Sequence, residues 1–185
     1  MEPVMAKIEH HDFTFEQDPG IVLRTGDINI AFVDDEVALE YIDGEMNIPK
    51  SATDNHIFGA IYTIANLLKK DGLSANFLIF NDPLIAKQYI ADNAERLTLL
   101  ISDNNMPGIS GFDMIQEMRA KGITVPAIIR SGLPNHIPAG MIVVGKEASL
   151  KAMYTTHIRP ILEAQGHLNV DGNNMGIEQA AKPAP

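Results

Sequence analysis

The chain has 185 residues, 45 % of them hydrophobic and 21 % charged, with a formal net charge of −10 and no cysteine. These values fit one globular domain with extensions, exclude disulfides and thiolate metal sites, and disfavour binding to nucleic acid or anionic lipid. No apolar run reaches the length of a membrane span or forms a signal-peptide core, so we expect a cytoplasmic protein without a membrane partner.

Strand-like and helix-like segments then alternate along the chain. Residues 1–27 form an N-terminal extension, in which Phe13–Phe15 and Ile21–Leu23 suit a hairpin or an added edge strand. The first strand of the domain proper is predicted at Ile28–Val33. Residues 36–50 that follow are an insertion, for which we expect an extra helical turn and a loop.

Helices and further strands are predicted after the insertion. Apolar residues recur at helical spacing on one face in the set Ile57, Ile61, Ile64 and Leu68. Residues 166–185 have the composition of a flexible C-terminal tail. The segments between are, in chain order, a strand at Ala75–Phe80, a helix from Pro83 to about Ala94, a strand at Leu97–Ile101, a helix at Gly111–Ala120, strands at Ala127–Ile129 and Met141–Val144, and a helix at about Ala148–Leu162.

This alternation predicts an α/β fold with right-handed crossovers. Five strands fit a doubly wound parallel sheet in the flavodoxin-like order 2-1-3-4-5, in which the first and third strands are neighbours. Residues 132–140 alone join the fourth and fifth strands, and they include Pro134 and Pro138. A full helix does not fit there, so we expect the fourth helix to be shortened or absent.

Polar residues follow four of the predicted strands. Asp34 and Asp35 follow the first, Asp103 the third, Ser131 the fourth and Lys146 the fifth. Because the carboxyl ends of parallel strands meet at one edge of a sheet, three carboxylates, a hydroxyl and an ammonium should share one pocket. Such a set suits a divalent cation with oxygen ligands and a phosphoryl group.

The ordered set of motifs resembles the receiver domain of bacterial two-component response regulators, of the chemotaxis-regulator type. It comprises Asp34-Asp35, Asp103-Asn104-Asn105-Met106-Pro107 with Gly111, Ser131 and Lys146. The resemblance covers about Ile28 to Leu162, and we expect the receiver domain to comprise residues 28–165. It implies that Asp103 accepts a phosphoryl group from a sensor histidine kinase or a phosphotransfer protein, as a carboxylate nucleophile. It further implies that Lys146 pairs with one phosphoryl oxygen and that Ser131 donates a hydrogen bond to another.

The same resemblance implies a bound Mg²⁺. Its ligands would be the carboxylates of Asp35 and Asp103 and the backbone carbonyl of Asn105, with Asp34 acting mainly through water. The metal would neutralise charge on the transferring group. Without it, crowding predicts a raised pKa for at least one of the carboxyl groups.

The departures from the family pattern affect the residues that transmit the signal more than the residues that take part in phosphorylation. Val143 occupies the place of the usual aromatic switch residue, three positions before the lysine, and Glu147 follows the lysine where proline is typical. The short segment after Ser131 also removes part of the face through which the family commonly signals. We therefore expect phosphorylation chemistry with an altered conformational readout.

Three functional hypotheses remain open. The leading one is a stand-alone receiver that catalyses only its own phosphorylation and dephosphorylation, and signals to an unknown downstream protein or by phosphorelay, with a homodimer as one option. A pseudo-receiver would bind its partner without phosphorylation. A Mg²⁺-dependent phosphohydrolase would use Asp103 as its nucleophile, although such enzymes typically place a second aspartate where Asn105 stands.

Overall fold

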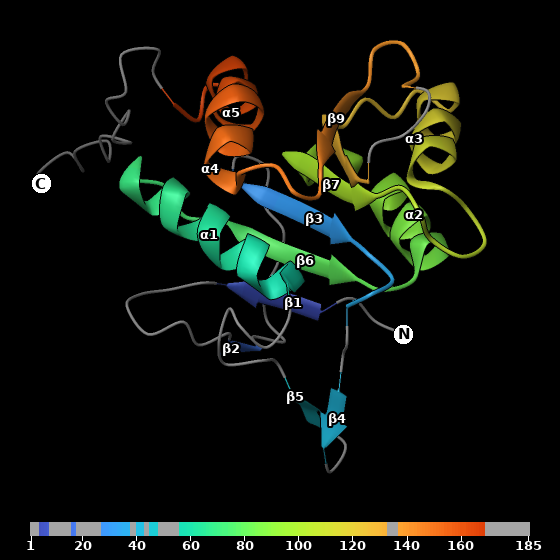
Figure 1. The fold of residues 1–185 in the computed structure, drawn as a ribbon, viewed down its shortest axis with the longest axis horizontal. Coiled ribbons are helices and arrows are strands. Elements are labelled where there is room, and N and C mark those ends of the chain that lie inside the picture. Colours follow the sequence, from blue (N-terminus) through green and yellow to red (C-terminus); the bar gives the residue numbers. More distant parts are fainter. Residues whose placement is uncertain are drawn as a thin grey trace, which may run out of the picture.

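A seven-stranded sheet forms the centre of the protein (Figure 1). We analysed a computed structural model, which describes residues 4–7, 16–17, 27–37, 40–42, 45–47, 56–132 and 137–168. The strands lie in the spatial order β2-β1-β6-β3-β7-β8-β9. Their bounds are β1 Val4–Lys7, β2 Glu16–Gln17, β3 Asn29–Val33, β6 Asn76–Phe80, β7 Leu99–Asp103, β8 Ala127–Ser131 and β9 Ile142–Gly145.

Five of these strands confirm the predicted doubly wound sheet. β6, β3, β7, β8 and β9 pair in parallel, which is the order 2-1-3-4-5 when they are numbered along the chain. β3 lies between β6 and β7, so the first and third parallel strands are neighbours. None of the described residues between β8 and β9 is helical, in agreement with the expected loss of the fourth helix.

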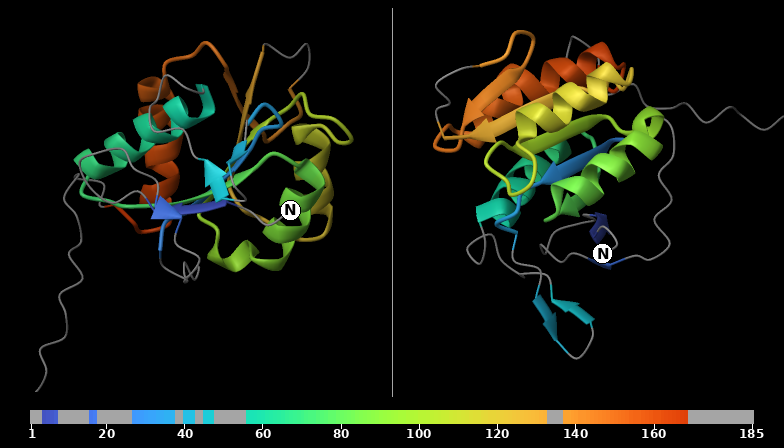
Figure 2. Two further views of the ribbon diagram at one scale, coloured as in Figure 1. Left: turned by 90° about the horizontal axis from the view of Figure 1, so that it is seen from below. Right: turned by 90° about the vertical axis from the view of Figure 1, so that its right-hand side faces the viewer.

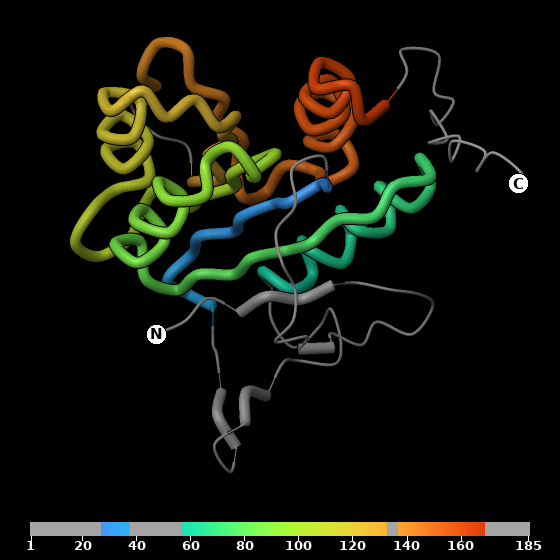
Figure 3. Tube along the Cα trace, turned by 180° about the vertical axis from the view of Figure 1, so that it is seen from behind, coloured from blue at the N-terminus to red at the C-terminus, as the bar shows by residue number. Residues whose placement is uncertain are grey.

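Helices cover both faces of the sheet. Helix α1 and the C-terminal helices lie on one face, while α2 and α3 lie on the other (Figures 2 and 3). The strands β3, β6, β7 and β8 are buried on both faces, which explains why their sequences are nearly continuous apolar runs. The helices are α1 His56–Lys70, α2 Pro83–Asp92, the 3₁₀ turn η1 Ala94–Arg96, α3 Gly111–Ala120, α4 Leu150–Met153, the π-helical turn η2 Tyr154–Ile158 and α5 Arg159–Ala164.

The two core clusters follow the alternation of side chains along each strand. Phe77 and Ile79 of β6 pack toward α1, whose predicted stripe from Ile57 to Leu68 is fully buried. Leu78 and Phe80 of the same strand pack toward α2 and α3. The amphipathic pattern of α1 therefore predicted both the helix and the face it buries.

The predicted C-terminal helix is present but contains a π-helical turn. Pro160 has no backbone N–H to donate to the carbonyl of Thr156, so regular α-helical bonding cannot continue through this turn. Tyr154 within the turn is buried, and its hydroxyl donates a hydrogen bond to Oδ2 of Asp71 at 2.8 Å. This contact fixes the C-terminal helix against the turn that follows α1.

The N-terminal extension adds two strands to the edge of the parallel sheet. β1 pairs antiparallel with β6, and β2 pairs antiparallel with β1. The segments predicted to be extended, Phe13–Phe15 and Ile21–Leu23, lie outside the described residues, as does the chain after Leu168. No helix within the described ranges is long and apolar enough to cross a membrane.

The described residues of the insertion, 36–37, 40–42 and 45–47, do not form the expected helical turn. β4 Glu40–Ile42 and β5 Glu45–Asn47 form a separate antiparallel pair, with Tyr41 opposite Met46. The prediction of a helical turn relied on the apolar residues of the segment and gave too little weight to its turn-forming residues. Asp43 and Gly44, between the strands, are the residue pair that two-residue hairpin loops favour, and Tyr and Ile have high strand propensity.

Candidate functional site

Three aspartates meet at the carboxyl end of the parallel sheet. Asp34 follows β3 directly, and Asp103 is the last residue of β7. Because Val33 pairs with Ser102 in parallel, the next residues of the two strands lie side by side. Carboxylate oxygens of Asp34, Asp35 and Asp103 lie within 4.8 Å of one another. The sheet order thus brings together the residues that the sequence analysis assigned to one pocket.

Lys146 follows β9 and reaches into this cluster. Its Nζ lies 2.9 Å from Oδ2 of Asp103, 3.5 Å from Oε2 of Glu36 and 4.0 Å from Oδ2 of Asp34. Burial lowers the pKa of the ammonium. The hydrogen bond and charge of Asp103, together with the charges of Asp34 and Glu36, raise this pKa by a larger amount. The net shift is upward, so Lys146 is a permanent cation at neutral pH.

The carboxyl group of Asp34 has a perturbed pKa. It is 5 % exposed, and burial raises its pKa above the ordinary value, with a further upward contribution from the charge of Asp103. The backbone N–H of Glu36, which donates to Oδ1 of Asp34 at 3.0 Å, and the ammonium of Lys146 act in the opposite direction. The predicted upward shift is therefore found at Asp34, although its main cause is burial.

Asp35 provides the observation that bears most directly on metal binding. Its Oδ1 is buried and has no hydrogen-bond partner in the described part of the chain. A buried carboxylate oxygen without a partner is costly, and a bound cation would satisfy it. Carboxylate oxygens from Asp34, Asp35 and Asp103 are the donor type that Mg²⁺ prefers. The residues therefore fit the metal that the resemblance implied.

The loop between β7 and α3 holds Asp103 in a fixed position. The backbone N–H of Asn104 donates to Oδ1 of Asp103 at 2.7 Å, and Asn104 in turn accepts bonds from the N–H groups of Gly111 and Phe112. Gly111 lies so close to the Asp103 carbonyl that a Cβ would overlap that oxygen. The glycine of the predicted motif is thus required by close approach of two backbone segments.

The remaining predicted site residues lie at the same edge of the sheet. Ser131 ends β8, is 2 % exposed, and accepts a backbone hydrogen bond from the Lys146 N–H at 3.0 Å. Asn105 is exposed in the loop, two residues after Asp103. Val143 is half-buried in β9 and packs against the core on the α2 and α3 side.

Two charged residues at the site were missed by the sequence analysis. Glu36 is an ion-pair partner of Lys146, although its side chain is 59 % exposed. Arg130 pairs in register with Asp103 across β7 and β8. The sequence did contain a signal for Arg130, which is a charged residue near the end of an otherwise apolar strand. A buried strand rarely contains a charged residue that has no partner.

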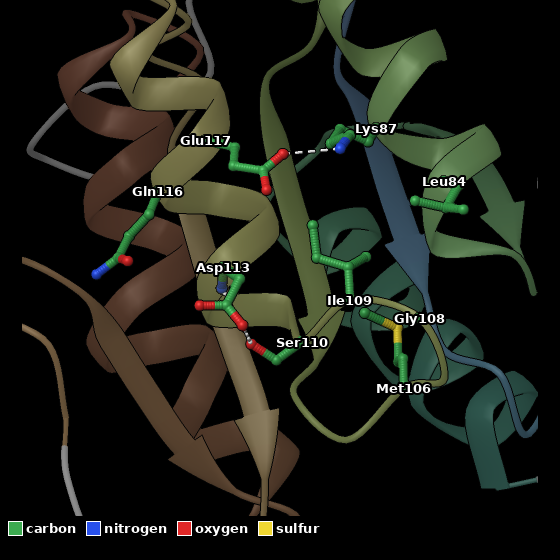
Figure 4. Close-up of a pocket in the computed structure, with 9 residues that line it drawn as sticks. All are labelled: Leu84, Lys87, Met106, Gly108, Ile109, Ser110, Asp113, Gln116 and Glu117. Atoms are coloured by element: carbon green, nitrogen blue, oxygen red, sulfur yellow. Dashed lines mark hydrogen bonds and ion pairs between the residues drawn. The ribbon is translucent and has the colours of Figure 1, made fainter.

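A separate pocket lies between α2 and α3. Its volume is about 630 Å³, and it contains none of the three clustered aspartates (Figure 4). Lys87 and Glu117 form an ion pair of 2.8 Å on its wall, while Met106 and Ile109 of the β7–α3 loop supply apolar surface. The pocket therefore borders the loop that holds Asp103 without being part of the carboxylate site.

Metal binding should be visible as stabilisation. We expect MgCl₂ at about one hundred times its Kd to stabilise the fold by about 2.7 kcal/mol, and to raise the melting temperature by roughly 5 to 10 °C. Asp35→Asn should remove most of this increase, because it removes a charged ligand. Asp92→Asn, an exposed carboxylate on α2, is the matched control and should respond like the unchanged protein. Equal stabilisation of all three proteins in thermal melts would contradict a site at Asp35.

Comparison with known proteins shows the class of fold. A scan against family models and a search of the curated proteins found no match. Among solved structures, the signal receiver domain of an HD domain-containing protein from Pseudomonas fluorescens Pf-5 superposes with a TM-score of 0.54 at 17 % identity, covering 80 % of this chain and 95 % of that one.

Other solved receiver domains give the same result. A response regulator receiver domain protein from Clostridium thermocellum has a TM-score of 0.52 at 19 % identity, with 75 % and 97 % of the two chains covered. The receiver domain of the Francisella response regulator 1452 has a TM-score of 0.52 at 16 % identity, with 75 % and 99 % covered. The chain has the fold of response regulator receiver domains, which confirms the fold that the motifs indicated.

Proposed function

We propose that the protein acts as a receiver that accepts a phosphoryl group on Asp103 in a Mg²⁺-dependent reaction. The observation that carries this proposal is the cluster itself. A buried Asp103 carboxylate is held by Lys146 at 2.9 Å. It lies beside Asp34 and beside an Asp35 oxygen for which the described residues offer no hydrogen-bond partner. Such a set prepares a nucleophile, a metal position and a fixed cation in one place.

The transfer is a displacement at phosphorus. An oxygen of the Asp103 carboxylate attacks the phosphorus of a phosphohistidine on the donor protein. The new P–O bond forms as the P–N bond breaks, and the electron pair of that bond returns to the imidazole nitrogen. The product is an acyl phosphate on Asp103, whose three outer oxygens carry the charge of the group.

The residues around Asp103 divide the remaining tasks. The carboxylates of Asp35 and Asp103 and the backbone carbonyl of Asn105 would hold Mg²⁺, with Asp34 acting through water, and the ion would supply neutralising charge. Lys146 exchanges its bond to Asp103 Oδ2 for one to a phosphoryl oxygen. Ser131 donates its hydroxyl to another phosphoryl oxygen.

Signalling would follow from this modification in the cytoplasm. The partners are a sensor histidine kinase or phosphotransfer protein and a downstream protein of unknown identity. Val143 in place of an aromatic residue, and the absence of helix from the described residues between β8 and β9, support an altered readout in place of the usual movement of a fourth helix.

The test is phosphorylation by a small donor. We expect acetyl phosphate or phosphoramidate with Mg²⁺ to add one phosphoryl group per chain, measured as intact mass, and EDTA to prevent the addition. No labelling, together with unimpaired partner binding, would identify a pseudo-receiver. Continued release of phosphate from a phosphate ester over many turnovers would identify a phosphohydrolase instead.

A further inference from the structure

Arg130 is a charged residue next to the phosphoacceptor that the reaction described above does not use. It is the Cα partner of Asp103 in the parallel pairing of β7 and β8. Two residues earlier, Ile101 pairs with Ile128, and both belong to the core on the α1 side. Because side chains two residues apart point to the same face of a strand, Asp103 and Arg130 stand beside each other on that face.

The guanidinium is fixed near the cluster. Nη2 of Arg130 donates a hydrogen bond to the backbone carbonyl of Lys146 at 3.4 Å. The side chain is half-buried, and burial lowers its pKa, while the carboxylates of Asp34 and Asp103 raise it; the net shift is downward. Arg130 remains charged at neutral pH because a guanidinium starts from a very high pKa.

This second cation changes the charge balance of the pocket. Asp34, Asp35, Asp103 and Glu36 carry four negative charges, against which Lys146 alone leaves a net charge of −3. With Arg130 the net charge is −2. By Coulomb's law this weakens the attraction for a divalent cation and strengthens the attraction for an added anion. The acyl phosphate carries nearly two negative charges where the Asp103 carboxylate carried one, so phosphorylation adds about one negative charge.

We propose that Arg130 is a second cation of the phosphoryl site, which weakens Mg²⁺ binding to the unmodified pocket and stabilises the phosphoryl group once it is on Asp103. This inference rests on the proposed function. Arg130 acts on Asp103 through charge at a distance and on Lys146 through its carbonyl, so it is a positioning residue. Its removal should therefore move two affinities in opposite directions.

The experiment compares Mg²⁺ and beryllofluoride binding in three variants. Arg130→Gln keeps an N–H donor for the Lys146 carbonyl but removes the charge, whereas Arg130→Lys keeps the charge. In Arg130→Gln we expect the Kd for Mg²⁺, measured by calorimetry, to fall about tenfold, and the Kd for beryllofluoride at saturating Mg²⁺ to rise about tenfold. Arg130→Lys and the exposed control Arg119→Met should stay close to the unchanged protein.

The outcomes separate charge from structure. Weaker binding of both ligands by Arg130→Gln would indicate a purely structural role and overturn the inference, as would unchanged binding of both. If Arg130→Gln melts early, Arg130→Met tests removal of the charge with an unbranched apolar side chain, which also lacks the donor to the Lys146 carbonyl. If the unchanged protein binds beryllofluoride and is labelled, only the role of Arg130 is at stake. If it does neither, the proposed function and the inference fall together.

Discussion

Asp103→Asn is expected to reduce phosphoryl labelling at least one hundredfold. The amide is neutral and a poor nucleophile, so the P–O bond cannot form at this position. The amide also lacks the negative charge that makes a carboxylate a strong ligand, so Mg²⁺ binding should weaken as well. The measurement is intact mass after incubation with acetyl phosphate and Mg²⁺, followed by peptide mapping of the modified residue.

A matched variant shows whether the loss is specific. Asp92→Asn makes the same chemical change on the exposed end of α2, and should be labelled to the extent of the unchanged protein. Melting curves of both variants should show folded proteins, because Asn has nearly the shape of Asp. Labelling that persists in Asp103→Asn would place the phosphoryl group on another residue and remove the basis of the assignment.

Gly111→Ala is expected to destabilise the fold by about 3 kcal/mol. The added Cβ would overlap the backbone carbonyl oxygen of Asp103 and would approach Cδ1 of Ile129 to 2.9 Å. The carbonyl belongs to a strand that is hydrogen-bonded on both sides, so it cannot easily move away. The measurement is chemical denaturation. If the added Cβ displaces Asp103, phosphoryl labelling should also fall in the same variant.

Gly145→Ala is the control for this substitution. A Cβ at Gly145 would meet no atom within 4 Å, and its φ lies outside the positive range, so we expect a change below about 1 kcal/mol. If both glycines tolerate alanine equally, the close approach of α3 to β7 does not constrain the site.

The sequence contained enough information to predict the parallel sheet. Each of its five strands is a local apolar run, and the polar residues Asp34, Asp103, Ser131 and Lys146 mark where four of them end. Once the strand order follows from the alternation with helices, the meeting of these side chains is a geometric consequence. The position of the carboxylate cluster could therefore be predicted from the strand order alone, without knowledge of individual long-range contacts.

Other features depend on pairing that the sequence does not encode locally. β1 is Val-Met-Ala-Lys, a four-residue strand that is extended because β6 offers an open edge. The π-helical turn at Tyr154 reflects the competition between Pro160 and the helix around it, which spacing alone does not resolve. Glu36 joins the site through an ion pair with Lys146 on the protein surface. The sequence around a surface glutamate does not indicate which cation it pairs with.

The antiparallel strands at the β6 side also limit how copies of this chain could assemble. Sheets that extend from molecule to molecule need a free hydrogen-bonding edge on both sides. Among the residues that the structure describes, the edge beyond β1 is the two-residue strand Glu16–Gln17, which is too short to template a neighbour. Within the described part of the chain, β9 is the outermost strand on the opposite side. Association through that strand would close as a two-fold pair and could not propagate into a fibre.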